Sequence, residues 1–444
     1  MNRRDFLKHT ALTGAAATVS ARRSQGQTPV VPASDRVTLG LIGTGARVQQ
    51  LIGAAREIPG VEIVALCDAY TGRAERARAR TGGRAEVVPD FRAVLSRADV
   101  DAVVIGTPDH LHTPIALAAF EAGKDAYIEK PMTYEVDEGL RIIEAVKRTN
   151  RVVQVGSQGM SSSLNGKARE MVQSGELGRV TMIRASYNRN TAGGAWIYPI
   201  PPDASPQTVN WEQFLGPAPR KPFSLERFFR WRCYWDYSGG IAGDLFVHLL
   251  TTIHYVMNAK MPSTVVATGE LYRWKESREV PDTVNAVLVY PEGFTVNLSS
   301  TFNNQSASES GFEILGTEGS LAFRGGHLSF TRENAREDNG WIVDSWPEAL
   351  QQAYYTDPKV QAQEAPHTWP QEMRSDGERW TEWGRNTDVV HMSHFIDAVR
   401  SRRQPAQNAE VGHHAASGAH MVNLALRRMA PVEWDFAKDR VVST

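Results

Sequence analysis

The chain has 444 residues, of which 41% are hydrophobic and 22% are charged, and its formal net charge is −1 at pH 7. This balance gives no indication of a protein that binds nucleic acid or an anionic membrane, and the length allows two or three domains. The two cysteines, Cys67 and Cys233, are too few for a zinc site or a disulfide framework, and a reduced, packed thiol is expected at Cys67.

The first residues have the pattern of a twin-arginine export signal. Arg3 and Arg4 precede a weakly apolar stretch, Thr10–Val19, and Val19-Ser20-Ala21 resembles a small-residue cleavage site. An N-terminal amphipathic helix is the alternative interpretation, but the arginine pair and the weak apolar stretch together favour a signal. The twin-arginine route carries folded proteins, so it suits an enzyme that binds its cofactor before export.

The export signal and a polar linker are predicted to cover residues 1–35. The twin-arginine translocase is then a partner during export, and the mature protein is expected to be periplasmic or secreted. No other run approaches the roughly 18 apolar residues of a membrane-spanning helix, so no membrane anchor is expected.

Residues 36–157 alternate short β-branched runs with helical stretches. Such alternation predicts βαβ units and a parallel, doubly wound sheet, the α/β architecture of an NAD(P)-binding Rossmann domain. The expected strands are 37–42, 61–67, 102–105, 125–128 and 152–155, and the expected helices are 73–80, 113–122 and 135–149, with a further helix-like stretch directly after residues 43–48.

A glycine-rich loop follows the first expected strand. Gly43 and Gly45 occupy the first two positions of the G-x-G-x-x-G pattern, where they permit a tight turn and a close approach of the backbone to a pyrophosphate. Val48 replaces the third glycine. Asp68 ends the second strand, where a carboxylate accepts from ribose hydroxyls and repels a 2′-phosphate. The pattern predicts NAD rather than NADP, with a helix cap or turn as the alternative role of Asp68.

Lys130 is the catalytic candidate of this domain. It lies in Glu129-Lys130-Pro131, directly after an expected strand, and the proline restricts its backbone and permits a cis bond. An ammonium beside a nicotinamide can polarise a substrate hydroxyl or hold its oxygen as a hydride leaves. A surface lysine paired with Glu129 is the alternative, and the upstream glycine loop favours the catalytic role.

Residues 158–432 are expected to form an α/β substrate-binding domain with a large, mainly antiparallel open sheet. The expected strands are 180–187, 264–271, 283–290, 294–301, 311–316 and 320–323, and the expected helices are 161–174, 241–257 and, within 388–428, 388–400 and 413–428. The stretch 190–240 is rich in Pro, Trp and Tyr and has no periodicity. It predicts an ordered loop excursion of the kind that shapes pockets.

The apolar helix of this domain carries a second catalytic candidate. Asp244 and His248 are four residues apart, which places both on one helix face, and the glycine-rich entry lets a ligand approach the helix start. His248 could act as a general base toward a substrate hydroxyl, with Asp244 binding or orienting. The alternative is that Asp244 stabilises the helix dipole and that His248 is a satisfied core residue.

The remaining histidines invite a metal-binding interpretation. They include His254 and the pairs His391/His394 and His413/His414. No cysteine or carboxylate cluster accompanies them in the sequence, so they are interpreted as structural and no metal site is predicted.

Taken together, the motifs resemble those of the glucose–fructose oxidoreductase / inositol dehydrogenase (Gfo/Idh/MocA) family, especially its twin-arginine-exported members. The resemblance covers about residues 36–430. It rests on 43–45, Asp68, 107–112, 122–124, 129–131, 175–179, 239–240, Asp244, His248 and 394–398.

The resemblance implies a Rossmann domain followed by an α/β domain whose open sheet covers the nicotinamide. It places the family's catalytic lysine on Lys130 and its Asp/His pair on Asp244 and His248. The implied cofactor-binding residues are Gly43, Thr44, Gly45, Ala46, Arg47, Asp68, Thr107, Pro108, His112, Glu129, Lys130 and Gln158.

Three functions remain open from the sequence. The leading hypothesis is an NAD(P)-dependent oxidoreductase acting on a secondary alcohol of a sugar, glycoside or cyclitol, with a tightly held cofactor and a homo-oligomeric assembly. The second is a glycoside hydrolase that uses bound NAD for transient oxidation and elimination. The third is a redox-inactive sugar-binding protein, against which Lys130, Asp244 and His248 argue. The sequence names neither the sugar nor the oxidised carbon.

Overall fold

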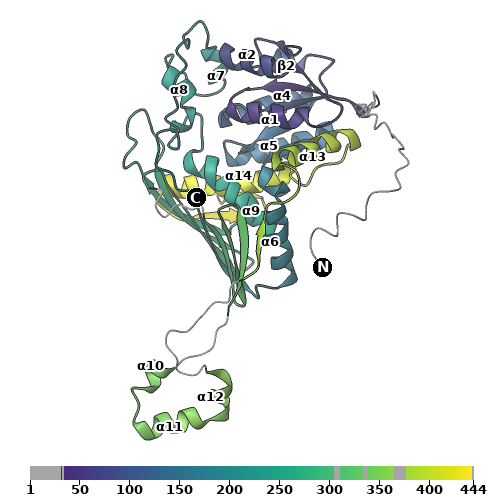
Figure 1. The fold of residues 1–444 in the computed structure, drawn as a ribbon. Coiled ribbons are helices and arrows are strands. Elements are labelled where there is room, and N and C mark those ends of the chain that lie inside the picture. Colours follow the sequence, from purple (N-terminus) through teal and green to yellow (C-terminus); the bar gives the residue numbers. More distant parts are fainter. Residues whose placement is uncertain (1–31, 33–34, 305–310, 334–338, 365–376, 443–444) are drawn as a thin grey trace, which may run out of the picture.

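The computed structural model describes residues 32, 35–304, 311–333, 339–364 and 377–442. It contains two sheets, each with its own covering helices, and a small helical segment that projects from the end of the second sheet (Figure 1). The predicted export signal lies outside the described residues.

The N-terminal sheet has six strands in the order β3-β2-β1-β4-β5-β6. All of its pairs are parallel, and every residue of β4, β5 and β6 is buried, as expected for strands covered on both faces. This confirms the Rossmann prediction. The strands are β1 Val37–Ile42, β2 Val61–Cys67, β3 Glu86–Val87, β4 Ala102–Ile105, β5 Asp125–Glu129 and β6 Val153–Gly156.

The helices of this sheet begin at the carboxyl ends of the strands, so their N-termini gather at one edge. The predicted helices are present within a few residues, and the short elements β3 and α3 are additions to the prediction. The helices are α1 Ala46–Arg56, α2 Thr71–Arg80, α3 Phe91–Leu95, α4 His112–Glu121 and α5 Val136–Thr149.

The second sheet has ten strands in the order β14-β13-β12-β11-β7-β10-β9-β8-β15-β16. Within this sheet, β7 and β10 form the single parallel pair among the described strands, which confirms the mainly antiparallel prediction. The strands are β7 Val180–Ser186, β8 Thr264–Glu270, β9 Thr283–Tyr290, β10 Phe294–Thr301, β11 Phe312–Gly316, β12 Gly319–Arg324, β13 His327–Arg332, β14 Arg379–Thr381, β15 Val432–Asp435 and β16 Arg440–Val441.

One face of this sheet is covered by helices and the other is open. α6 Ser163–Ser174, α9 Val247–Met257 and α14 Ala409–Arg428 lie together on the covered face (Figure 1). β9 alternates buried and exposed residues along its length, as a strand with one solvated face does.

The C-terminal helix α13, Thr387–Ser401, belongs to the N-terminal core. Its apolar face includes Val389, Met392 and Phe395 and packs in the same cluster as β1 and α1. The sequence prediction grouped this helix with the second domain because it follows that domain along the chain. The structure shows that the chain returns to the first sheet.

The excursion between β7 and α9 is ordered and reaches back to the N-terminal sheet. It contains the short helices α7 Trp211–Leu215 and α8 Leu225–Phe229. Tyr70 and Val209 form a β-bridge, and the Tyr70 hydroxyl donates to Asp203 at 2.6 Å. These contacts hold the excursion over the carboxyl edge of the sheet, where it closes one side of a cavity.

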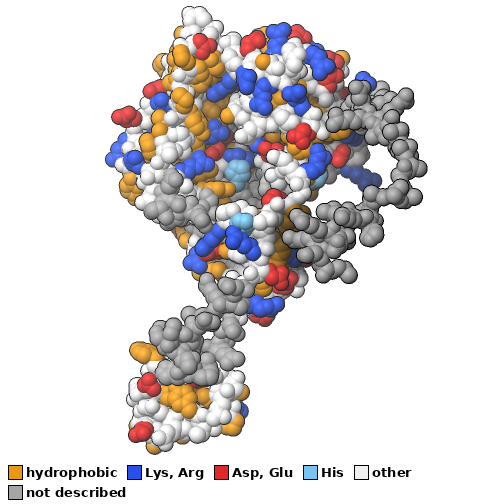
Figure 2. All heavy atoms as spheres, in the orientation of Figure 1, with side chains coloured by type: hydrophobic (Ala, Val, Ile, Leu, Met, Phe, Trp, Pro, Cys, Tyr) orange, Lys and Arg blue, Asp and Glu red, His pale blue; other side chains and the backbone are white. Residues whose placement is uncertain are grey.

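Residues 339–364 form the projecting segment, with α10 Gly340–Val343, α11 Glu348–Thr356 and α12 Pro358–Gln363 (Figure 1). Figure 2 shows hydrophobic side chains on its surface, and Trp341, Ile342 and Leu350 of this segment are exposed. The sequence predicted no element here. Among the described residues, none of the helices combines the length and apolar character needed to cross a bilayer.

Candidate active site

A cavity of about 780 Å³ opens at the carboxyl ends of the N-terminal strands. It lies where ligands bind in doubly wound sheets, at the point where the strand order reverses between β1 and β4. The residues predicted from the sequence that line it are Gly43, Gly45, Ala46, Arg47, Asp68, Thr107, Pro108, His112, Glu129, Lys130, Gln158, Asp244 and His248. Thr44 is buried beside them.

The glycine loop has the geometry that a pyrophosphate needs. Gly43 has a φ of +79°, and a Cβ there would lie 2.7 Å from the backbone nitrogen of Thr107, so only glycine fits. Gly45 caps α1 without a side-chain hydrogen bond, and a Cβ there would meet nothing within 4 Å. Gly45, Ala46 and Arg47 line the cavity, so the start of α1 borders the space in which a dinucleotide phosphate would bind.

Asp68 bridges two backbone segments at the end of β2. Its Oδ2 accepts from the Thr44 N–H at 2.6 Å, and its Oδ1 accepts from the Tyr70 N–H at 2.8 Å. The Thr44 hydroxyl also donates to Oδ2 at 3.2 Å, so of the roughly four acceptor positions that an ionised carboxylate offers, about one remains for a ribose hydroxyl. The residue thus supports the loop and remains able to bind a ligand.

The Glu129 carboxylate forms its ion pair with Arg47, and from Lys130 it accepts the backbone N–H at 3.3 Å. Arg47 Nε lies 3.0 Å from Glu129 Oε1, and Gln158 Nε2 donates to the same oxygen at 3.2 Å. Arg47 also pairs with Asp388 of α13 at 2.7 Å. This network joins β5, α1 and α13, which explains how the returning helix fixes the wall of the cavity.

His112 joins the loops that follow β4 and β5. Its Nδ1 lies 2.7 Å from the carbonyl oxygen of Pro131, and its Nε2 lies 2.9 Å from the carbonyl oxygen of Thr107. The Lys130–Pro131 peptide bond is cis. The imidazole therefore holds the turn that carries Lys130 against the glycine-loop side of the cavity.

Lys130 crosses the cavity to Asp244. Its Nζ donates to the Asp244 backbone oxygen at 2.8 Å and to Oδ1 at 3.0 Å, and both side chains are only 12% exposed. Arg232 Nε donates to the same Oδ1 at 2.9 Å. Burial opposes ionisation of Asp244, but the charges of Lys130 and Arg232 outweigh it and hold the pKa of Asp244 well below its usual range. Asp244 is thus an ionised anchor for two cations.

Asp244 lies in a π-helical turn, Ala242–Phe246, that runs directly into α9. The sequence predicted a regular helix over both. Such single π-helical turns are frequent at functional sites. Upstream of this turn, the buried Asp109 accepts from the Gly239 N–H at 3.1 Å, so the glycine-rich entry is tied to the N-terminal sheet.

His248 also lines the cavity, one residue into α9. Burial, and after it the positive charge of Lys130, lowers the pKa of His248 to about 3. The imidazole is therefore neutral near pH 7, with a lone pair on one ring nitrogen available to accept a proton.

The excursion supplies residues that the sequence did not single out. Arg232 lies over the Trp231 ring at 4.2 Å, and Arg189 and Tyr198 line the same side of the cavity. The composition of 190–240 predicted a pocket wall. It could not identify these residues, because only the contact of Arg232 with Asp244 distinguishes it from the arginines nearby.

Three family models match parts of the chain. Residues 37–157 match the oxidoreductase family with an NAD-binding Rossmann fold, and residues 166–322 match the GFO/IDH/MocA C-terminal domain. Residues 1–20 match the TAT (twin-arginine translocation) pathway signal sequence. This confirms the predicted export signal, and the mature protein is periplasmic or secreted.

Individual relatives match over shorter stretches. Glycosyl hydrolase family 109 protein 2 of Shewanella sp. (strain ANA-3) is 36% identical over 172 residues, covering 34% of this chain and 38% of the relative. Inositol 2-dehydrogenase 3 of Saccharopolyspora erythraea is 36% identical over 157 residues, covering 35% of this chain and 46% of the relative. Each match therefore spans less than half the length of the relative.

A solved structure extends the likeness to nearly the whole chain. Levoglucosan dehydrogenase in complex with NADH and levoglucosan aligns with a TM-score of 0.65 at 20% identity, covering 90% of this chain and 99% of that one. At this identity the match shows a shared fold.

Proposed function

This chain belongs to the Gfo/Idh/MocA oxidoreductase family, and we propose that it transfers a hydride between a secondary alcohol of a sugar, glycoside or cyclitol and a tightly bound nicotinamide cofactor, with the alcohol oxidised to the ketone or the ketone reduced to the alcohol. One observation carries the proposal. The Lys130 ammonium is held at 3.0 Å from the Asp244 carboxylate, inside a cavity that also contains the dinucleotide loop. Bound NAD would supply the hydride acceptor.

Lys130 would bind the reacting oxygen. An ammonium has three N–H donors, and two of them are directed at the backbone and carboxylate oxygens of Asp244. The third is available for a substrate hydroxyl, where a fixed positive charge stabilises the developing alkoxide. Asp244 would orient the lysine, because its carboxylate already accepts from both Lys130 and Arg232.

His248 would take the hydroxyl proton. Its imidazole is neutral and lines the same cavity as Lys130. Arg232 and the aromatic residues Tyr198 and Trp231 would hold the sugar, because aromatic rings pack against apolar sugar faces and a guanidinium donates to hydroxyl oxygens. These groups come from the excursion, so this segment would set the substrate.

We infer NAD rather than NADP as the cofactor from the position of Asp68. Replacing it with Asn keeps one acceptor oxygen and removes the charge that opposes a 2′-phosphate. Asp68→Asn should therefore narrow the preference for NAD over NADP. Asp68→Ala should weaken NAD binding by about tenfold or more, since hydrogen bonds to charged groups contribute about 1.5–3 kcal/mol.

Titration of both nucleotides against the apoprotein, followed by tryptophan fluorescence, measures these changes. Asp99→Ala is the matched control, because Asp99 is an exposed carboxylate paired with Arg97 away from the cavity. Wild-type protein that prefers NADP would contradict the inferred role of Asp68.

A single experiment tests the function. The cofactor released from purified protein is identified by mass spectrometry, and reduction of bound NAD is then followed in single turnover with a panel of sugars, glycosides and cyclitols. An oxidoreductase reduces its cofactor with one substrate class and needs an external acceptor to turn over. A protein without bound nucleotide and without reduction by any member of the panel would refute the proposal.

The redox-assisted glycosidase is the second candidate, since a relative of this chain is named a glycosyl hydrolase. It would use the same Lys130, Asp244 and His248. The two functions differ in the assay, because a hydrolase releases the aglycone of a glycoside continuously without an external oxidant.

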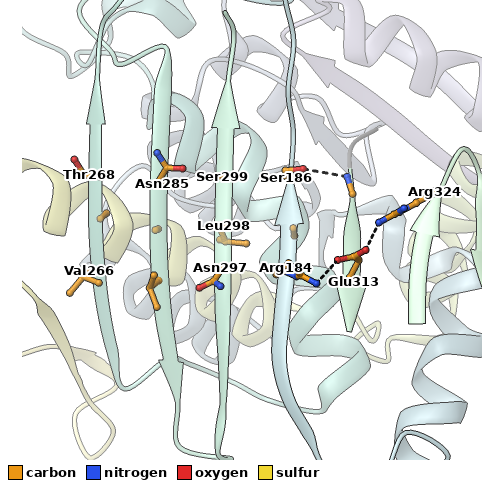
Figure 3. Close-up of a pocket in the computed structure, with 15 residues that line it drawn as sticks. Arg184, Ser186, Val266, Thr268, Asn285, Asn297, Leu298, Ser299, Glu313 and Arg324 are labelled. Carbon is orange, nitrogen blue, oxygen red and sulfur yellow. Dashed lines mark hydrogen bonds and ion pairs between the residues drawn. The ribbon is translucent and has the colours of Figure 1, made fainter. Parts of the chain in front are cut away.

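The open sheet face supports the predicted homo-oligomer. Val266, Val287 and Val289 are each 41–42% exposed on it, and Arg184 pairs with Glu313 at 3.3 Å across neighbouring strands (Figure 3). A flat face with apolar side chains and balanced charges suits an isologous contact with a second copy. Light scattering should give a dimer or larger assembly that Val287→Arg dissociates, and a monomeric wild-type protein would exclude this contact.

A further inference from the structure

Two histidines of α14 and one aspartate of the C-terminal hairpin, β15 and β16, form a cluster of side chains that could bind a metal ion. Asp439 lies in the turn between β15 and β16, and it faces His413 and His414 near the start of α14. None of these three residues lines the cavity described above. The sequence interpretation treated the two histidines as structural, because no cysteine or carboxylate cluster accompanies them in the sequence, and the structure brings Asp439 to them from 25 residues beyond His414 (439 − 414).

The spacing of the three side chains is that of a metal site. His414 Nε2 lies 3.1 Å from Asp439 Oδ1, His413 Nε2 lies 3.6 Å from Oδ2, and one ligand atom from each residue lies within 4.8 Å of the others. Ligand atoms around a tetrahedral ion with bonds of 2.0–2.1 Å are separated by about 3.3 Å. Both measured distances are close to this value.

The Nδ1 side of the His413 ring is fixed by neighbouring groups. Its Nδ1 lies 3.2 Å from the Ser417 hydroxyl, and a Cβ on Gly139 would lie only 2.0 Å from this nitrogen, so the backbone of α5 packs directly against the ring. Metal-binding histidines have their second nitrogen fixed in this way.

We propose that His413, His414 and Asp439 bind a first-row divalent cation, with Zn²⁺ as the best match, through two imidazole nitrogens and one carboxylate. Water would complete the four-coordinate shell. With neutral imidazoles the three ligands carry one negative charge, which a divalent cation compensates. The ion would tie the C-terminal hairpin to α14, and through His413 to α5, so we infer a structural site independent of the catalytic one.

Binding is tested on full mature protein without a polyhistidine tag. After treatment with a chelator, calorimetric titration with Zn²⁺ should show one ion per chain, and Co²⁺ should give a visible absorption band that Zn²⁺ abolishes. His414→Ala and Asp439→Asn should each weaken Zn²⁺ binding by at least about tenfold, since even residues behind the ligands change metal affinity 10- to 100-fold. Zn²⁺ should also raise the melting temperature of the wild-type protein and not of the variants.

His394→Ala is the matched control, because it removes a histidine of α13 that lies outside the cluster. It should retain wild-type Zn²⁺ affinity. Asp439→Asn has the shape of the native residue, so near-ultraviolet circular dichroism can verify that it is folded. The proposal is overturned if the wild-type protein binds no stoichiometric Zn²⁺, or if both ligand variants bind it as the wild type does. The cluster would then be a pair of histidine–aspartate hydrogen bonds.

Discussion

Lys130→Met should lower turnover by about 10² to 10⁴ while nucleotide binding persists. Methionine has a similar length and no charge, so the substitution removes the ammonium that would stabilise the developing alkoxide. Asp244 should stay in place, because Arg232 Nε still donates to its Oδ1. Single-turnover reduction of bound NAD with the best substrate of the panel measures the rate, and the melting temperature verifies the fold.

Lys147→Met is the control for this prediction. Lys147 is 70% exposed on α5 and pairs only with the surface residue Glu410 in the described part of the chain. Its variant should react at the wild-type rate. If Lys130→Met retains a near-wild-type rate, the ammonium has a structural role beside Asp244 and the proposed mechanism fails.

His248→Ala should also lower turnover by about 10² to 10⁴, because it removes the group proposed to accept the hydroxyl proton. His248→Gln should be equally slow, since an amide can donate and accept hydrogen bonds but cannot take a proton at neutral pH. Rapid-reaction measurements on both variants distinguish proton acceptance by His248 from hydrogen bonding alone. A His248→Gln enzyme with a near-wild-type rate would mean that hydrogen bonding alone is required.

The pH dependence follows from the environment of the same residue. An ordinary histidine acting as the base would give a rate that rises with pH through its titration. Burial and Lys130 lower the pKa of His248 to about 3, so the imidazole is already deprotonated above about pH 5. The value of kcat/KM should therefore show no histidine inflection between pH 5 and pH 8. An inflection near pH 6.5 that His248→Gln abolishes would contradict the lowered pKa of His248.

Much of the fold could be predicted because its signals are local. The buried runs of β1, β2 and β4 alternate with helical segments, and this alternation is enough to specify a parallel sheet. Gly43 is similarly informative, since a positive φ and a close backbone contact can be inferred from a glycine that follows a strand. By contrast, α13 was grouped with the wrong neighbours, because amphipathic periodicity identifies a buried face without identifying what covers it.

The sequence by itself determined the export signal, the dinucleotide loop and the identity of Lys130, Asp244 and His248 as candidates. Each of these depends on residues close together in the chain. Only the tertiary structure decided which charges meet. It brings Arg232 to Asp244, Arg47 to Glu129, and Asp439 to the two histidines of α14. Ion pairs and ligand clusters form between side chains from distant segments, and their partners are set by how the sheets and helices pack.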